Sequence, residues 1–177
     1  MADYVTDGKI GIDLTATYAS TSAGSTTLFP VTPGTRVTTS NNGTYIFVRA
    51  ESTISAYDAV IMSTYGDSAS QTPVLRAVPV TTTNAAALGW NMVGFAQTAI
   101  ASSYYGWVAL NGVVKVNLLV ACQPKVPLYT TSTAGSLDDT TVSAGFIQGI
   151  VANTSATSAS APFCVVNNAG LMMVGAG

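Results

Sequence analysis

From residue 36 onward, the chain is a succession of short segments in which hydrophobic and polar residues alternate. In TYIFVRA (44–50), for instance, Tyr45, Phe47 and Arg49 lie on one face of the predicted strand, and Ile46 and Val48 lie on the other. A period of two residues is that of a half-buried β-strand. About ten such segments are separated by turns rich in glycine, asparagine, serine and proline. We therefore predict an all-β domain over residues 36–177, an antiparallel β-sandwich or barrel of jelly-roll-like form.

Turn signals divide this domain into predicted hairpins. Asn-Gly pairs at 42–43 and 111–112 are flanked by strand-forming residues, and Asn-Gly is the preferred pair for the two positive-φ positions of a type I′ turn. We expect a third hairpin around residues 167–170, Asn-Asn-Ala-Gly. One short helix is predicted at residues 84–88, with Asn84 as its N-cap.

Residues 1–35 show no clear period and are interpreted separately from the domain. The stretch 15–34 is rich in serine, threonine, alanine and glycine, which is typical of a loop. We expect an extended N-terminal arm or a long loop, and a disordered tail is the alternative. Leu28 and Phe29 are the candidates that would dock this arm onto a neighbouring subunit.

The chain contains few charges for its length. Of its 177 residues, 8% are Asp, Glu, Lys or Arg, against roughly 25% in an average soluble domain. The mean hydropathy is +0.41. The most apolar stretch, 104–122, is interrupted by residues such as Lys115 and Asn117, so we expect no membrane span. An excess of apolar residues without a membrane-spanning segment indicates that apolar surface is buried between subunits. We therefore predict an oligomer. A monomer hydrated by serine and threonine is the alternative.

The charge distribution also argues against a nucleic-acid partner. The net charge is −2 and the isoelectric point is near 4.6. The six basic residues are scattered and form no basic stripe. Residues 1–14 lack the basic and apolar regions of a secretory signal peptide, so we expect synthesis in the cytoplasm.

The sequence lacks the residues of common catalytic and metal sites. It has no histidine and no Ser-x-x-Lys, Walker A or Gly-x-Gly-x-x-Gly motif. Asp138 and Asp139 are adjacent in a predicted turn, where their side chains point apart. With Ser136 and Thr140 they could hold a weak Ca²⁺, but a solvated turn is the favoured interpretation. We predict no enzymatic activity, no cofactor and no bound metal. A hydrolase using Asp58 or Asp138 is the alternative from the enzyme class.

Cys122 and Cys164 lie in the apolar contexts LVACQP and APFCVV. Their spacing fits no zinc pattern, and two cysteines make no disulfide framework. We expect buried free thiols, with a single bridge between them as the alternative.

Three neighbouring aromatic residues, Tyr104, Tyr105 and Trp107, are candidates for a contact surface. Aromatic side chains in a strand-like segment most often belong to the core or to a subunit interface. A patch that binds sugar or protein is the alternative interpretation.

Several segments between residues 33 and 152 share their pattern with a known group of proteins. They are PGTRVTTSNNGTYIFVRAES (33–52), AYDAVIM (56–62), VGFAQTAI (93–100), YYGWVALNGVVKV (104–116), LYTTSTAGSLDD (128–139) and FIQGIVA (146–152). In this arrangement the chain resembles small capsid decoration (cement) proteins of tailed bacteriophages. The resemblance implies a β-rich fold, often trimeric, seated on the outside of the major capsid lattice, with neither enzymatic activity nor a cofactor.

The resemblance and the composition lead to one functional expectation. We expect a structural virion protein that decorates and stabilises a phage capsid by bridging subunits of the major capsid protein. It would be made in the host bacterial cytoplasm, form a homotrimer on the capsid exterior, and bind neither nucleic acid nor membrane. The alternative is a phage receptor-binding or tail-associated β domain that recognises glycan or protein. The candidate contact residues are Leu28, Phe29, Tyr104, Tyr105 and Trp107.

Overall fold

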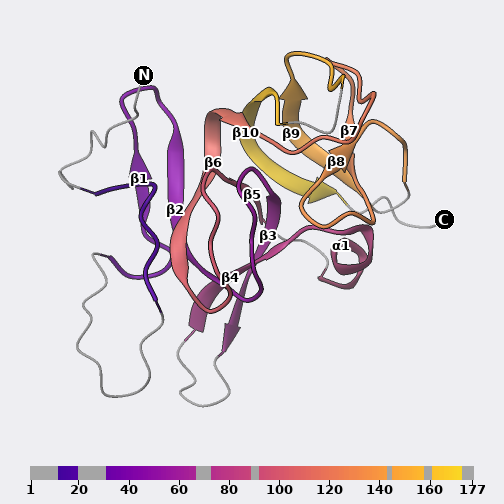
Figure 1. The fold of residues 1–177 in the computed structure, drawn as a ribbon. Coiled ribbons are helices and arrows are strands. Elements are labelled where there is room, and N and C mark those ends of the chain that lie inside the picture. Colours follow the sequence, from indigo (N-terminus) through magenta and orange to yellow (C-terminus); the bar gives the residue numbers. More distant parts are fainter. Residues whose placement is uncertain are drawn as a thin grey trace.

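The computed structural model describes residues 12–19, 31–66, 73–88, 92–142, 145–157 and 161–172. Within these ranges the chain forms ten strands and one short helix (Figure 1). The elements are β1 (Arg36–Thr38), β2 (Thr44–Ala50), β3 (Ala59–Gly66), β4 (Pro73–Pro79), α1 (Thr82–Leu88), β5 (Met92–Ala96), β6 (Tyr105–Lys115), β7 (Leu128–Thr130), β8 (Leu137–Asp138), β9 (Phe146–Ala152) and β10 (Phe163–Met172). The predicted all-β class is confirmed. Among the described residues, no helix is long and apolar enough to cross a membrane.

Five of the strands pair into a closed ring, which corresponds to the barrel alternative of the prediction. β2 pairs with β4 and β6, β3 pairs with β4 and β5, and β5 pairs with β6. All these pairs are antiparallel except β2 and β4, which are parallel. A ring with an odd number of strands cannot alternate in direction all the way round, so one neighbouring pair must be parallel. The predicted antiparallel arrangement is corrected at this pair.

The interior of the ring is filled by one of two hydrophobic clusters. In β2, β3, β5 and β6, alternate side chains belong to different clusters, as Phe47 and Val48 of β2 do. The inner cluster draws on all five ring strands and on two flanking residues; it contains Ile46, Val48, Ala50, Ile54, Val60, Met62, Ala77, Ala96, Ile100, Val108 and Leu110. The second cluster includes the outward side chains of the ring, and the remaining strands cover them. The period of two therefore places apolar residues on both sides of the ring wall.

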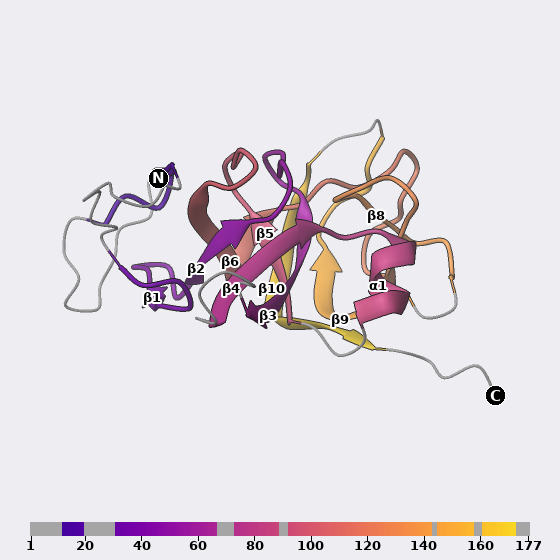
Figure 2. The ribbon, with the colours of Figure 1, turned by 90° about the horizontal axis from the view of Figure 1, so that it is seen from below.

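The sheet continues from the ring through β10. β6 pairs with β10, which pairs with β9, and β9 is followed by β7 and β8. Both ribbon views place β8, β9 and α1 at the end of the molecule opposite to β1 (Figures 1 and 2). β6, eleven residues long, belongs to both parts and joins them.

β6 runs without interruption through the Asn-Gly pair at 111–112, so the hairpin predicted there is wrong. A type I′ turn needs positive φ at both central residues, but of this pair only Gly112 has it, with a φ of 114°. The chain does not reverse because the two halves of β6 have different partners. Its first half pairs with β2, with a register shift between Thr44 and Tyr45, and its second half pairs with β10. The Asn-Gly pair lies at a bulge that bends one long strand.

The hairpin predicted around residues 167–170 is also wrong. β10 is one strand whose register with β9 shifts between Val166 and Gly170. Asn168 takes a φ of 47°, and opposite it a Cβ on Gly149 of β9 would lie 2.6 Å from the Asn167 carbonyl oxygen. Both ends of β10 pair with β9, so these residues form a bulge and not a turn.

Two other local predictions hold, one of them with a change. β1 and β2 form the hairpin expected at 42–43, where Asn42 has a φ of 57°. The predicted helix is present as α1, but its N-cap is Thr81 and not Asn84. The Thr81 N–H donates to Asn84 Oδ1 (2.7 Å), and the Asn84 N–H donates to Thr81 Oγ1 (3.1 Å). This reciprocal pair is a capping box.

Part of the predicted arm packs against the domain of its own chain. Tyr18 and Tyr105 form an antiparallel bridge with backbone hydrogen bonds of 2.9 and 2.8 Å. Ile12, Leu14 and Val31 pack on the second hydrophobic cluster. The docking candidates Leu28 and Phe29 lie outside the described residues, so their role stays a prediction.

Candidate interaction surface

The three candidate aromatic residues occupy three different environments. Trp107 is 2% exposed and packs on Phe47, with ring centroids 5.0 Å apart. Tyr105 is half-buried and stacks on Phe47, with ring centroids 5.9 Å apart. Tyr104 is exposed. Trp107 thus belongs to the core, and a stacking platform for a sugar, as the receptor-binding alternative would use, is not present across the three side chains.

A more extensive apolar surface lies on β6, β9 and β10, and the sequence reasoning missed it. The exposed fractions are 62% for Val113, 44% for Val151, 54% for Phe163 and 45% for Val165. Val165 of β10 is in register with Val113 of β6 on one side and with Val151 of β9 on the other. We call these four residues the valine face. The three valines form a continuous row across three hydrogen-bonded strands, and Phe163 lies two residues along β10 from Val165.

The valine face exists because neighbouring positions of β10 are all apolar. Cys164 and Val166 point inward and are buried, whereas Phe163 and Val165 point to the opposite side of the pleat. In a sheet with one solvated face, these outward positions are usually polar. The signal in the sequence was the run FCVV, in which both faces of the strand are hydrophobic.

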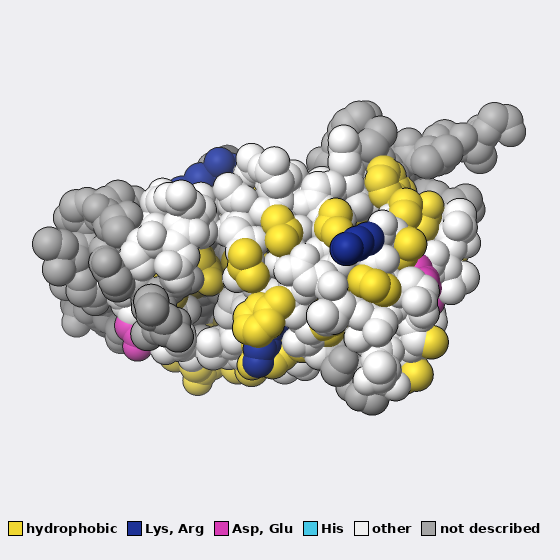
Figure 3. All heavy atoms as spheres, turned by 90° about the horizontal axis from the view of Figure 1, so that it is seen from above, with side chains coloured by type: hydrophobic (Ala, Val, Ile, Leu, Met, Phe, Trp, Pro, Cys, Tyr) yellow, Lys and Arg dark blue, Asp and Glu magenta, His cyan; other side chains and the backbone are white. Residues whose placement is uncertain are grey.

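A single lysine borders the valine face. Lys115 of β6 is in register with Phe163, and its Nζ lies 5.5 Å from the Phe163 ring centroid and 5.3 Å from that of Tyr57. These distances are those of a cation–π interaction. Figure 3 shows one side of the molecule, where hydrophobic side chains form small groups among uncharged atoms and charged groups are few.

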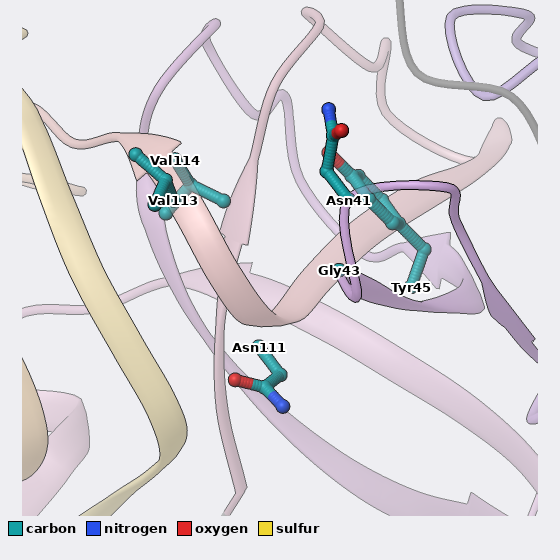
Figure 4. A pocket seen from close by; sticks show the side chains of 6 residues that line it. All are labelled: Asn41, Gly43, Tyr45, Asn111, Val113 and Val114. Carbon is teal, nitrogen blue, oxygen red and sulfur yellow. The ribbon is translucent and has the colours of Figure 1, made fainter.

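A small pocket adjoins the valine face between the turn 39–43 and β6. It has a volume of about 230 Å³ and is lined by Asn41, Gly43, Tyr45, Asn111, Val113 and Val114. Asn41 and Tyr45 lie on the turn side of it, and the two valines lie across on β6 (Figure 4). Ligand pockets usually measure about 300–1,000 Å³. This pocket is therefore of a size for one side chain of a partner.

The two thiols are buried and unbridged, as the apolar contexts predicted. Burial raises the pKa of Cys122 to about 11, with further contributions from Asp139 and Asp138, and burial raises that of Cys164 to about 12. Ligand atoms of Cys122, Asp138 and Asp139 lie within 4.8 Å of one another. Asp139 Oδ2 accepts a hydrogen bond from the Gln123 N–H (3.0 Å).

Asp58 holds a structural position. Its side chain is buried, and it accepts hydrogen bonds from the Ser55 N–H (2.7 Å) and from Asn117 Nδ2 (3.0 Å). Burial raises the pKa of this carboxyl above its ordinary value, although both hydrogen bonds act in the opposite direction. The carboxyl joins the start of β3 to the segment that follows β6.

Comparison with known proteins gives one structural neighbour. No family model matches the sequence, and no curated protein matches it. Among solved structures, the chain is similar to the N base of the head fiber gp8.5 of bacteriophage phi29. The two chains are 16% identical, and the match covers 72% of this chain and 97% of the other, with a TM-score of 0.49.

Proposed function

We propose that this chain is a structural virion protein that decorates a phage capsid and stabilises it by bridging subunits of the major capsid protein. The observation that carries the proposal is the valine face, a row of exposed apolar side chains in a chain with 8% charged residues. The resemblance of the sequence to capsid decoration proteins supplies the partner. The protein would act on the capsid exterior, without catalysis or a cofactor.

The size of the valine face favours attachment at several points. Complete burial of a Val or Phe side chain stabilises by about 1.5–3 kcal/mol. Each of the four residues has about half of its surface left to bury, so one valine face contributes about 3–6 kcal/mol on that scale. Association itself costs an estimated 4–15 kcal/mol. A single contact is therefore weak, and a homotrimer on a repeating lattice would bind through the combined effect of several contacts.

Co-sedimentation with capsids tests this proposal. The capsids would come from the phage that encodes this chain, assembled without it. The double variant Val113→Thr, Val165→Thr keeps β-branched side chains but replaces apolar methyls by hydroxyls. Each change removes about 1 kcal/mol of contact energy, so the affinity of one contact should fall about 30-fold.

Val120→Thr is the matched control, because Val120 is 60% exposed but lies outside the valine face. It should bind as the wild type does, and all variants should keep the wild-type melting temperature. Equal binding by the double variant and the wild type would contradict the proposal. Selective binding of the wild type to a glycan array, without binding to capsids, would support the receptor-binding alternative instead.

A further inference from the structure

Two arginine side chains stand next to each other on the outer wall of the ring. Arg49 of β2 and Arg76 of β4 are in register on the parallel pair of strands. Like charges in register on neighbouring strands are destabilising. The chain has only six basic residues, and this arrangement of two of them lowers the stability of the isolated protein.

The described residues supply one carboxylate for the two guanidinium groups. Arg76 Nη1 donates to both oxygens of Glu51, at 2.9 and 2.8 Å. Arg49 receives no carboxylate from the described residues. The Nε atoms of both arginines are buried without a hydrogen-bond partner. A buried donor that lacks a partner forfeits the hydrogen bonds it made in water. Because the Nε of Arg49 is itself buried, only the two Nη groups of this guanidinium are left to donate to a partner.

An aromatic residue flanks the pair on the other side. Arg49 is also in register with Tyr105 of β6. Arg49 remains partly exposed, so a partner can reach it. Tyrosine and arginine are among the residues enriched at the centre of protein interfaces. We call Arg49, Arg76 and Tyr105 the arginine row.

We infer that the arginine row is a second contact surface, at which Arg49 binds an aspartate or glutamate side chain of the partner protein. A guanidinium group binds a carboxylate through two parallel hydrogen bonds, and the partner's carboxylate would replace the counter-charge that Arg49 lacks. A nucleic-acid phosphate is disfavoured by the net charge of −2 and the absence of a basic stripe in the sequence. The inference rests on the proposed function, which makes the partner the capsid shell, and it adds the chemistry of the contact.

Capsid binding by Arg49→Gln tests the inference. At low ionic strength, near 50 mM, the variant should bind its capsids about tenfold more weakly than the wild type. The difference should shrink in about 0.5 M salt, where screening removes the charge contribution. Lys125→Gln removes the same charge from an exposed lysine elsewhere and should bind as the wild type does. Arg49→Lys keeps the charge but lacks the planar guanidinium, so its affinity for capsids should lie between those of Arg49→Gln and the wild type.

The melting temperature of the free protein separates a contact role from a structural one. Since Arg49 faces Arg76 and no described carboxylate, Arg49→Gln should leave the melting temperature unchanged or raise it. A lower melting temperature would assign Arg49 to the fold and overturn the inference. Wild-type binding by Arg49→Gln, while the valine-face variant fails to bind, would overturn the arginine row alone. Failure of the wild-type protein to bind capsids would overturn the proposed function, and the inference with it.

Discussion

Gly135 is the position at which the structure makes its sharpest stability prediction. Gly135 has a φ of 74°, and its backbone links three segments: its N–H donates to the Val80 carbonyl (2.9 Å), and its carbonyl accepts from the Ala59 N–H (2.8 Å). A Cβ built on Gly135 would lie 2.6 Å from Asp58 Cβ and would overlap the carboxyl group. Gly135→Ala therefore forces Asp58 to move.

The cost of Gly135→Ala has two parts. Left-handed backbone costs a non-glycine residue about 1–2 kcal/mol. Asp58 is 5% exposed, so it cannot turn into solvent, and it would lose at least one of its two hydrogen bonds. A hydrogen bond to a charged group contributes about 1.5–3 kcal/mol. The expected loss is about 3–5 kcal/mol, against a total stability of about 5–15 kcal/mol for an ordinary domain.

Urea unfolding followed by circular dichroism measures this loss, and Gly34→Ala is its control. Gly34 has a φ of 91°, but among the described residues no atom beyond its chain neighbours lies within 4 Å of the place that a Cβ would take. Its replacement should therefore cost only the backbone strain of about 1–2 kcal/mol. In the double variant Asp58→Ala, Gly135→Ala, the overlap with the carboxyl group is removed and only the contact with the Cβ of residue 58 remains, so the two losses should be less than additive. Equal losses at Gly34 and Gly135 would refute the reasoning.

Three further predictions concern the ionisable groups and the aromatic residues. Burial raises the pKa of Asp58 above its ordinary value of 3.8. The protonated carboxyl therefore contributes fully to the free energy of unfolding below pH 3.8, and this contribution is lost as pH rises through the pKa of the folded state. Urea unfolding over this pH range should show the decline in the wild type and not in Asp58→Asn. With pKa values of about 11 and about 12, Cys122 and Cys164 should react with iodoacetamide at pH 8 only after denaturation, and rapid labelling of the native protein in mass spectrometry would contradict their burial. Trp107→Ala should cost about 3–5 kcal/mol in urea unfolding, whereas Tyr104→Ala should stay within about 0.5 kcal/mol; the reverse order would move Trp107 out of the core.

The period of two in the sequence was enough to predict the fold class, because each strand places its apolar residues by that period whatever its partner is. The same period cannot say which strands pair, since pairing depends on contacts between distant segments. The closure of the ring by β2 and β4 is such a contact. It joins residues 49–50 to residues 76–77, with the whole of β3 between them.

The Asn-Gly pair at 111–112 shows why a strong local signal failed. The pair permits a positive φ but does not require the chain to reverse. Here β2 and β10 bind the two halves of β6 and hold it extended. Gly112 also lets the backbone of β6 approach that of the turn at Gly43, because a Cβ on Gly112 would lie 3.0 Å from the Gly43 Cα. Tertiary pairing thus overrode a turn preference, in the way that it often overrides strand propensity.

The same bulges that defeated the hairpin predictions create the valine face. Had β6 and β10 turned back at residues 111–112 and 167–170, they would not have run side by side with Val113 and Val165 in register. The extended strands place an outward row of valines across a sheet whose inward row is already buried. The outward apolar row stabilises the free chain less than the inward row does, because about half of the surface of each of its side chains remains in water. Outward strand positions are usually polar, and this row of valines breaks that rule. Local patterns that break a folding rule without an evident compensating gain in stability are expected at functional sites.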